Sequence, residues 1–322
     1  DTAAYTRFGQ IVIMCLIQAG GLGLITFATL YLALPRRRLS IVSRGLITDY
    51  SLAEIEYQPK KVVKTIVGLT FAIEGIGMIV MNFRFSALGY PFFTAAFHSV
   101  SAFCNAGFST FPDNLERFVR DPLINITVMA LIVMGGLGFI VMRDIGKLIV
   151  REKTQLSYHS SVVLRTTVSL ILFGAAILLA LEYNGAFHCL SMGQKVMAAF
   201  FASITPRTAG FDTIGPSAFG RGSVLVTILL MFIGASPAST GGGIKTTTFF
   251  ILVMTAFRYQ DGADSVDYRG RSIGGHTIFK AVGVVVKGII VVFAAVIVIL
   301  AGEKARGYSL PSIDVIYEVV SA

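Results

Sequence analysis

The sequence predicts an all-α polytopic membrane protein, and three observations support this fold class. Of the 322 residues, 54% are hydrophobic and only 14% are charged, whereas soluble domains usually carry about a quarter charged residues. The apolar residues gather into runs long enough to cross a bilayer, which takes about 20 helical residues. Short motifs between these runs recur at a constant spacing, which indicates repeated structural units.

Six segments have the length and apolar character of a membrane-spanning helix. A chain with so many spans has the lipid bilayer as its main partner. The six predicted spans are approximately Phe8–Leu34, Val62–Phe83, Pro122–Met142, Thr166–Leu181, Ser223–Phe257 and Thr277–Ala301.

The net charge of +9 could suggest nucleic acid, but the placement of the basic residues argues against it. Lys and Arg concentrate in alternate connectors, and this positive-inside pattern predicts that these connectors face the cytoplasm of a multi-pass cell-membrane protein. We therefore expect no nucleic-acid partner. The basic connector residues are Arg36, Arg37, Arg38, Arg44, Lys60, Lys61, Lys64, Arg143, Lys147, Arg151, Lys153, Arg165, Arg258, Arg269, Arg271, Lys280 and Lys287.

Two further segments are apolar and helix-compatible but only about half the length of a span. They are Pro91–Phe103 and Gly193–Thr205, and each is followed by a loop that contains glycine. A short helix that enters the membrane and returns through a loop is a re-entrant hairpin, which survives only where protein or water surrounds it. Amphipathic surface helices or apolar extracellular loops are the alternative at this point.

An internal repeat favours the re-entrant interpretation. The segment Phe97–Phe108 aligns with Phe200–Phe211 at an offset of 103 residues, and both copies share the pattern Ala-Gly-Phe-x-Thr. A second signature follows each copy, Gly135–Gly138 in the first case and Gly241–Ile244 in the second. A related one, Gly20-Gly21-Leu22-Gly23, lies near the start of the chain.

These matches predict four M1–P-loop–M2 repeats of the potassium-channel-like type around one pore. The final residues, Val320-Ser321-Ala322, match those before the first visible loop. We therefore expect the first and last repeats to be truncated in this chain. The predicted divisions are 1–34 for the second helix of repeat 1, 62–148 for repeat 2, 165–259 for repeat 3, and 277–322 for the outer helix and pore helix of repeat 4.

Re-entrant loops around one axis suit a cation, because a ring of backbone carbonyls can replace its hydration shell. Glycine permits the required backbone conformation, and Gly107 and Gly210 would have that role rather than being ordinary turn glycines. The preceding short helices would direct their partially negative ends toward the cation. The candidate ion-binding residues are Cys104, Asn105, Ala106, Gly107, Thr208, Ala209 and Gly210.

The segment Ser223–Phe257 is too long for one plain span, and its centre contains a proline and three consecutive glycines. These residues cannot continue a stable helix, so we expect helix–loop–helix with an intramembrane loop that gates the pathway. Lys245 would either hold this loop through carbonyl or carboxylate contacts or anchor the following half-helix. The candidate gate residues are Gly234, Ala235, Ser236, Pro237, Ala238, Ser239, Thr240, Gly241, Gly242, Gly243 and Lys245.

Other ionisable residues in apolar surroundings are functional candidates by default. We expect Arg207 to point away from the pore axis and to pair with a carboxylate or carbonyls, and Glu74 to hydrogen-bond a neighbouring hairpin. No nucleophile–base pair or paired carboxylates can be placed, so we expect neither an enzyme nor an organic cofactor.

The motifs Cys104–Phe108, Thr205–Phe211 and Gly234–Thr246 resemble the Trk/Ktr/HKT superfamily of potassium transporters, and the similarity runs essentially end to end. The resemblance implies K⁺ uptake across the cell membrane, a homodimer, and cytosolic nucleotide-binding regulatory subunits of the RCK/KTN type. The basic connectors Arg36–Lys64 and Arg143–Arg165 would contact those subunits.

Three alternatives to potassium uptake stay open at this point. A sodium-conducting or sodium–potassium co-transporting member of the same architecture is the first. An unrelated transporter with inverted repeats is the second, although both visible loops follow the same order along the chain. A membrane enzyme is a distant third.

Overall fold

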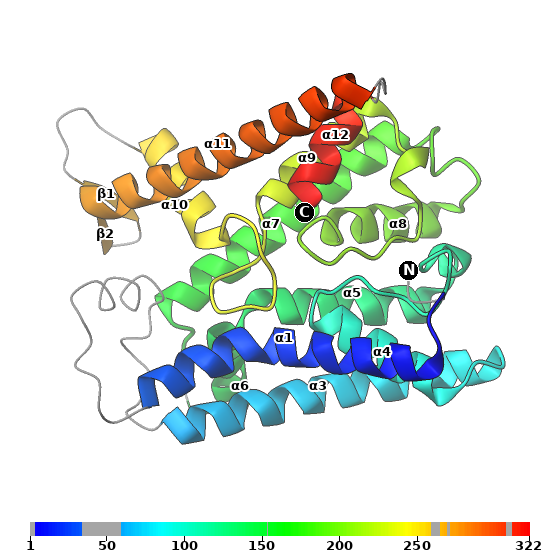
Figure 1. Cartoon of the computed structure of the whole chain (residues 1–322). Coiled ribbons are helices and arrows are strands. Elements are labelled where there is room, and N and C mark those ends of the chain that lie inside the picture. The colour runs from blue at the N-terminus through cyan, green and yellow to red at the C-terminus, as the bar shows by residue number, and fades with distance from the viewer. Residues whose placement is uncertain (1–3, 34–58, 153, 259–264, 269–270, 307–310) are drawn as a thin grey trace.

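The computed structural model describes residues 4–33, 59–152, 154–258, 265–268, 271–306 and 311–322, without the side chains of 23–33, 59–62, 271 and 303–306. The helices form a bundle in which most axes run roughly side by side (Figure 1). The predicted cytoplasmic residues Arg36, Arg37, Arg38, Arg44, Lys153 and Arg269 lie outside this description. The elements are α1 (Arg7–Ala33), α3 (Pro59–Ala87), α4 (Phe92–Phe103), η3 (Glu116–Phe118), α5 (Pro122–Leu137), α6 (Phe139–Ile149), α7 (Tyr158–Glu182), α8 (Met192–Ile204), η4 (Pro216–Ala218), α9 (Arg221–Phe232), α10 (Thr246–Arg258), β1 (Ser265–Tyr268), β2 (Arg271–Gly274), α11 (Gly275–Arg306) and α12 (Ser312–Ser321).

The same order of elements occurs twice in the middle of the chain. A long helix, a short apolar helix, a loop and an interrupted helix follow one another from α3 to α6, and again from α7 to α10. The short helices α4 and α8 have 12 and 13 residues, which is too short to span a bilayer. Both half-length helices were predicted from the sequence, and the structure confirms that they are helical.

Three of the described helices are long and apolar enough to cross a membrane: residues Val63–Ala87, Tyr158–Glu182 and Gly275–Gly302. The pair α5 and α6 would make a fourth span, although the two helices are bent by 106° at their junction. The remaining predicted spans correspond to α1, which is 27 residues long, and to the interrupted pair α9 and α10. The predicted helix–loop–helix of Ser223–Phe257 is confirmed.

One predicted span is corrected by the structure. The sequence predicts an uninterrupted helix over Pro122–Met142, but α5 ends at Leu137 and α6 begins at Phe139. Gly138 between them has φ 85° and ψ 153°, a conformation that is essentially restricted to glycine. The backbone N–H of Phe139 donates to the carbonyl oxygen of Ala238, 2.9 Å away, in place of a helical partner.

Two smaller differences from the predicted all-α architecture lie at one end of the bundle. We call it the basic end, because it contains Arg143, Lys147 and Arg258 (Figure 1). Strands β1 and β2 pair as an antiparallel hairpin between α10 and α11, which the sequence analysis did not predict. In addition, α7 begins at Tyr158, eight residues before the predicted start at Thr166. The Ser157 side chain caps this helix by accepting from the Ser160 backbone N–H at 3.2 Å, which satisfies a donor that the first turn leaves free.

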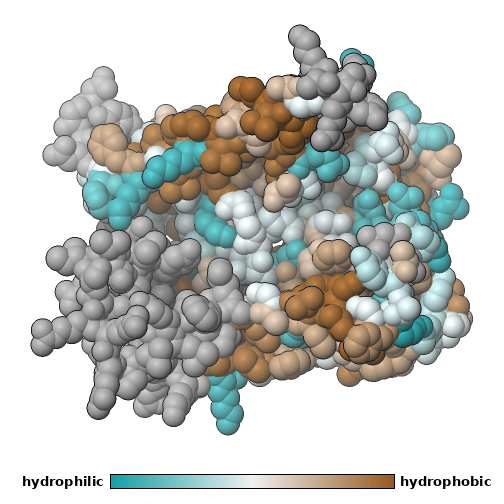
Figure 2. All heavy atoms as spheres, viewed as in Figure 1, coloured by the Kyte–Doolittle hydropathy of each residue, from teal (hydrophilic) through white to brown (hydrophobic). Residues whose placement is uncertain are grey.

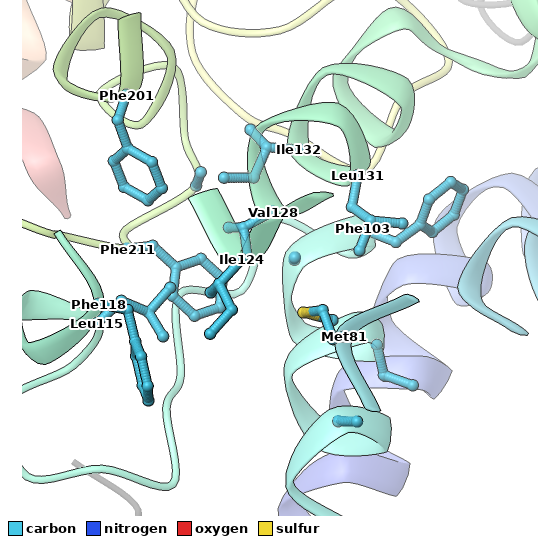
Figure 3. Close-up of a cluster of buried hydrophobic side chains, with 14 of the residues drawn as sticks. Met81, Phe103, Leu115, Phe118, Ile124, Val128, Leu131, Ile132, Phe201 and Phe211 are labelled. Atoms are coloured by element: carbon cyan, nitrogen blue, oxygen red, sulfur yellow. The ribbon is translucent and has the colours of Figure 1, made fainter. Parts of the chain in front are cut away.

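The main hydrophobic core joins the two similar units. Figure 3 shows Phe201 and Phe211 of the second unit beside Val128 and Ile132 of α5, which belongs to the first. Phe103, at the end of α4, lies in the same buried cluster. The two re-entrant segments are therefore packed against each other through α5.

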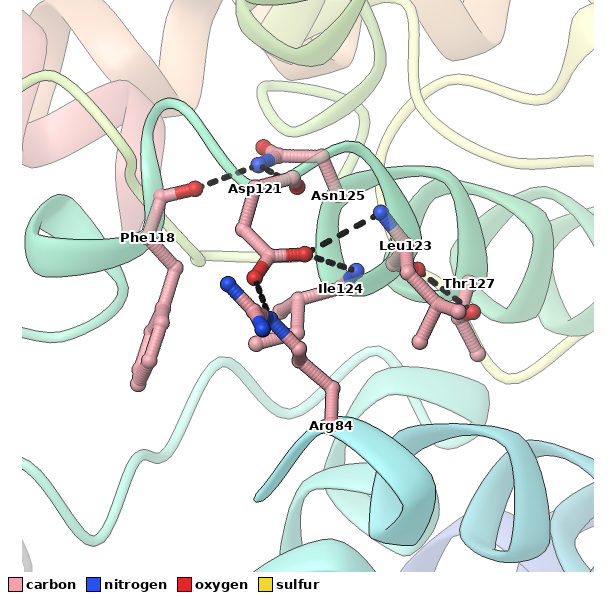
Figure 4. A network of polar contacts seen from close by, with 7 residues as sticks. All are labelled: Arg84, Phe118, Asp121, Leu123, Ile124, Asn125 and Thr127. Atoms are coloured by element: carbon pink, nitrogen blue, oxygen red, sulfur yellow. Dashed lines mark hydrogen bonds and ion pairs between the residues drawn. The ribbon is translucent and has the colours of Figure 1, made fainter. Parts of the chain in front are cut away.

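In each of the two similar units, a carboxylate links helices at the end of the bundle opposite the β hairpin (Figure 1), called the loop-rich end below. In the first unit, Asp121 caps α5 by accepting from Leu123 N at 3.1 Å, and it pairs with Arg84 near the end of α3 (Figure 4). In the second unit, the buried Glu182 at the end of α7 accepts from Gly220 N at 2.8 Å, just before α9. In each unit, a carboxylate thus links two helices through charge-assisted hydrogen bonds.

The surface of α11 is apolar along most of its length. Brown side chains run along this helix in Figure 2, and teal side chains gather toward the two ends of the bundle. Its exposed residues include Phe279, Val291 and Val298, which are 80%, 66% and 70% exposed. A helix that is apolar on its outer surface is expected where lipid, not water, surrounds it.

Candidate functional site

The two loops that were predicted to be re-entrant, residues 104–110 and 205–213, have the same unusual backbone and are called the re-entrant loops below. Gly107 and Gly210 both have φ 73°. Asn105 and Thr208, which each lie two residues before the glycine, have φ 53° and 75°. Left-handed conformations are rare for residues with a Cβ, yet both loops adopt them at the same two positions. The internal repeat in the sequence therefore corresponds to a repeat in backbone geometry.

The loops meet at their glycines. A Cβ atom placed on Gly107 would lie 2.6 Å from the carbonyl oxygen of Ala209 and 2.8 Å from the Cα of Gly210. A Cβ atom on Gly210 would lie 3.3 Å from the Cα of Gly107. Any side chain at Gly107 would therefore force the loops apart, so both the backbone angle and the close approach require glycine there.

Each loop is held from behind by a hydroxyl near the end of its short helix. Ser101 Oγ donates to the carbonyl oxygen of Phe108 at 2.7 Å, and Thr205 Oγ1 donates to that of Phe211. In the first loop, the fully buried His98 also contacts Ser109 Oγ through Nε2 at 2.9 Å. These bonds occupy the carbonyls that follow the glycines and leave the preceding ones available for a ligand.

A cavity of about 920 Å³ lies beside the two loops. Its wall combines both re-entrant loops with the glycine-rich loop (residues 233–245), α9, α11 and α12. Five of the seven predicted ion-binding residues line it, namely Asn105, Ala106, Thr208, Ala209 and Gly210.

The other two predicted ion-binding residues lie elsewhere. Gly107 is at the contact between the loops, and Cys104 caps the end of α4. The Cys104 side chain is buried, and its Sγ donates to Glu74 Oε1 at 3.8 Å, away from the cavity. Glu74 thus contacts the neighbouring hairpin, as the sequence analysis expected.

The glycine-rich loop separates α9 from α10 and lies against the break between α5 and α6. Ser236 N donates to Gly136 O at 3.0 Å, and Thr240 N donates to Gly135 O at 3.3 Å. Gly241, Gly242 and Gly243 line the cavity next to Thr240. The glycine-rich loop therefore contacts α5 and borders the same cavity as the re-entrant loops.

Two positively charged side chains, those of Lys245 and Arg207, donate hydrogen bonds to carbonyls of the glycine-rich loop. Lys245 Nζ donates to Gly241 O at 2.7 Å and to Gly242 O at 3.5 Å, which favours the first of the two roles considered for it. Arg207 is only 8% exposed, and its Nη2 donates to Gly234 O at 3.3 Å. This carbonyl is of the kind that the sequence analysis expected as its partner.

Sequence reasoning missed two groups of residues at this site. The Gly135–Gly138 signature was found as a repeat, but its role as the place where the glycine-rich loop lies was not. Asp212 follows Gly210 and Phe211 and lines the cavity toward the loop-rich end. Burial, together with the charges of Glu116 and Asp113, raises the pKa of the Asp212 carboxyl to about 6.

Comparison with known proteins identifies several relatives. The Ktr system potassium uptake protein B of Bacillus subtilis is 34% identical over 99% of this chain and 71% of its own length. The protein of the same name from Vibrio alginolyticus is 34% identical over 99% and 70%. The potassium/sodium uptake protein NtpJ of Enterococcus hirae is 33% identical over 85% of the chain and 61% of that protein.

The fold also matches a solved structure. The crystal structure of the potassium transporter TrkH from Vibrio parahaemolyticus superposes with a TM-score of 0.69 at 17% identity, over 92% of this chain and 59% of that one. The chain thus has the fold of that multi-pass membrane transporter and spans about three fifths of its length. A family model described as a cation transport protein matches residues 1–322. Taken with the relatives that are 34% identical, this match shows that the chain belongs to the TrkH family of cation transport proteins.

Proposed function

We propose that this protein carries potassium ions across the cell membrane, and that the ions pass through the cavity that both re-entrant loops border. The observation that carries the proposal is the paired geometry of Asn105–Gly107 and Thr208–Gly210. Both stretches are left-handed at the same positions, and both border one cavity. Repetition of a costly backbone conformation at one place indicates a functional constraint rather than two ordinary turns.

Backbone carbonyls are suitable ligands for potassium. In channel filters, rings of carbonyl oxygens replace the water that surrounds the ion. The carbonyls that follow the glycines, those of Phe108 and Phe211, already accept hydroxyl hydrogen bonds. The ligands would therefore come from the carbonyls before them, those of Asn105, Ala106, Thr208 and Ala209. The order of elements from α3 to α6 recurs from α7 to α10, and this recurrence supports our proposal of four such repeats around one pore.

The glycine-rich loop would act as the gate. It borders the same cavity, and its carbonyls bind Lys245 and Arg207. Those interactions are hydrogen bonds to a segment of small residues outside the helices, so the loop would be displaced without unfolding α9 or α10. We infer that transport requires this displacement.

Partners follow from the same family relationship. The relatives from Bacillus subtilis and Vibrio alginolyticus are named as components of a Ktr system. We propose that this protein is a homodimer and works with cytosolic nucleotide-binding subunits of the RCK/KTN type. The described basic residues Arg143, Lys147 and Arg151 lie on or beside α6, toward the predicted cytoplasmic end, and are candidates for that contact.

A second candidate function is sodium transport, or combined sodium and potassium transport, through the same loops. The observation that favours it is the relative from Enterococcus hirae, which is named a potassium/sodium uptake protein. Both candidates use one ion path and differ only in discrimination between the two ions.

The test is rubidium uptake into cells that lack their own potassium uptake systems, with the full-length protein. Gly107→Ser and Gly210→Ser are compared with wild type at equal membrane abundance. Gly68→Ser is the matched control, because a Cβ atom added to Gly68, a helical glycine of α3, would have no described neighbouring atom within 4 Å. We expect the two loop variants to lose uptake or discrimination against sodium and the control to retain both. Normal uptake and selectivity in both loop variants would overturn the proposal.

A further inference from the structure

The Thr240 hydroxyl joins the glycine-rich loop to the first re-entrant loop. Asn105 Nδ2 donates to Thr240 Oγ1 at 2.8 Å, and Thr240 Oγ1 donates to the carbonyl oxygen of Phe103 at 3.2 Å. The hydroxyl thus accepts one hydrogen bond and donates another, which uses its single proton fully. Its two partners lie more than 130 residues earlier in the chain, on either side of the α4 C-cap.

Both partners are groups that need an external hydrogen bond. Phe103 is the last residue of α4, and the final carbonyls of an α-helix have no partner within the helix. Asn105 has φ 53°, a left-handed conformation that asparagine adopts more readily than most residues with a Cβ. The Thr240 hydroxyl therefore binds both the end of α4 and the Asn105 side chain at the start of the loop.

The backbone of Thr240 is anchored on a different element. Its N–H donates to Gly135 O on α5 at 3.3 Å. A Cβ atom on Gly135 would collide with the carbonyl oxygen of Phe103, so α4, α5 and the glycine-rich loop meet closely at this point. Displacement of the glycine-rich loop would have to break the contacts from Thr240 to the re-entrant loop.

The second re-entrant loop lacks the equivalent bond. Thr208 occupies the position that matches Asn105, but its hydroxyl is buried with no hydrogen-bond partner among the described residues. It lies against Gly241, where a Cβ atom would collide with Thr208 Oγ1. At these matching positions, the glycine-rich loop is therefore hydrogen-bonded to the first loop through Thr240 and only packed against Thr208 of the second, to which it is hydrogen-bonded through Arg207 instead.

We propose that Thr240 is a positioning residue for ion discrimination: its hydroxyl holds the first re-entrant loop in the ion-binding shape and couples that shape to the position of the glycine-rich loop. The inference rests on the proposed function, since it assumes that the re-entrant loops bind the ion. It assigns to one side chain of the glycine-rich loop an effect on selectivity in addition to any effect on opening.

The test compares Thr240→Val, which keeps the shape of the side chain but removes the hydroxyl, with Thr240→Ser, which keeps the hydroxyl. Rubidium uptake and its inhibition by sodium are measured in proteoliposomes containing the full-length protein. Thr255→Val is the matched control, because the Thr255 hydroxyl donates within α10, to Ile251 O at 2.8 Å. We expect Thr240→Val to lose about tenfold in discrimination, as for the loss of one hydrogen bond, and Thr240→Ser and Thr255→Val to discriminate as wild type does.

Thr240→Ala serves as a second variant without the hydroxyl, in case valine prevents accumulation in the membrane. Unchanged discrimination in a folded Thr240→Val or Thr240→Ala protein would overturn the inference. So would an equal loss in Thr240→Ser, because that residue retains the bonding group. Gly107→Ser, measured in parallel, separates the two proposals: if it abolishes uptake while Thr240→Val behaves as wild type, only the role of Thr240 fails. If Gly107→Ser and Gly210→Ser are also both normal, the proposed ion path fails.

Discussion

Single polar residues in this protein are mostly bound to backbone groups. Lys245 and Arg207 donate to carbonyls of the glycine-rich loop, and Ser101 donates to a carbonyl of the first re-entrant loop. Ionisable groups are costly within a membrane unless they are paired or hydrogen-bonded. Their partners here are segments that lack regular hydrogen bonding, so each polar side chain stabilises an irregular piece of backbone.

Asp121 provides a test of stability at this scale. We expect Asp121→Ala to destabilise the protein by about 1–2 kcal/mol, because it removes the cap of α5 and leaves Arg84 without its ion pair. Thermal unfolding in detergent would measure the effect. Asp113→Ala is the matched control, because Asp113 and Arg117 form an ion pair in which both side chains are 35% exposed. Such a pair is worth less than about 1 kcal/mol, and an equal loss in the two variants would contradict this account.

From the raised pKa of the Asp212 carboxyl, we predict that ion uptake depends on pH. Burial and the nearby charges of Glu116 and Asp113 raise the pKa of Asp212 to about 6, so the carboxyl is charged at neutral pH and neutral at pH 5. Tyr317 also faces it but is uncharged over this range. We expect the rubidium concentration for half-maximal uptake to rise as external pH falls through 6, because a negative charge at the cavity is lost.

The Asp212→Asn variant should remove this pH dependence and resemble wild type at pH 5. Asp267→Asn is the control, since Asp267 is exposed on β1 at the opposite end of the bundle. A wild-type pH profile in Asp212→Asn would show that another group titrates.

At the scale of elements, the two interrupted helices depend on each other. The glycine-rich loop, which separates α9 from α10, lies against the break between α5 and α6. Backbone groups that have no helical partner at the break form hydrogen bonds with backbone groups of the loop. The break in Ser223–Phe257 was predictable because proline and consecutive glycines are local signals. The break at Gly138 was not, because Pro122–Met142 has the length of a plain span and the partner of Phe139 N lies about 100 residues away.

Gly138→Ala tests this dependence. Alanine at φ 85° and ψ 153° is strained, and its Cβ would lie 3.1 Å from the carbonyl oxygen of Ala238. We expect a loss of about 1–3 kcal/mol in stability, seen as a lower melting temperature in detergent. Gly146→Ala is the control, because Gly146 is within α6, no atom of the described residues lies within 4 Å of the added methyl group, and alanine favours helix there. A Gly138→Ala protein as stable as the control would contradict the role assigned to this break.

For the molecule as a whole, the sequence predicted the class of fold and the approximate positions of the helices better than the contacts of its site. Apolar runs and the distribution of Lys and Arg are properties of long segments, and they are readable without tertiary structure. The re-entrant loops were found because they recur. That Cys104 faces Glu74 rather than the cavity could not be predicted, because it depends on how α4 rotates against α3. The ion-binding role of the remaining residues stays a prediction.

The arrangement in the membrane is testable with cysteine labelling. Cys189 is exposed in the connector between α7 and α8, at the end of the bundle opposite the β hairpin. Because Cys15 is also exposed, the experiment uses a Cys15→Ser background, in which we expect an impermeant maleimide to label Cys189 in intact cells and the further change Cys189→Ser to abolish labelling. With both serine changes present, Ser272→Cys on β2 should be labelled only after permeabilisation. Labelling of Ser272→Cys in intact cells would contradict the predicted orientation.

The most direct test of the central claim is the position of rubidium in crystals of the full-length protein, located by its anomalous scattering. The account predicts an anomalous peak in the cavity that both re-entrant loops border, beside the carbonyl oxygens of Asn105, Ala106, Thr208 and Ala209, and its loss when sodium replaces rubidium. Rubidium peaks found only elsewhere in the protein, with none beside these carbonyls, would contradict the account.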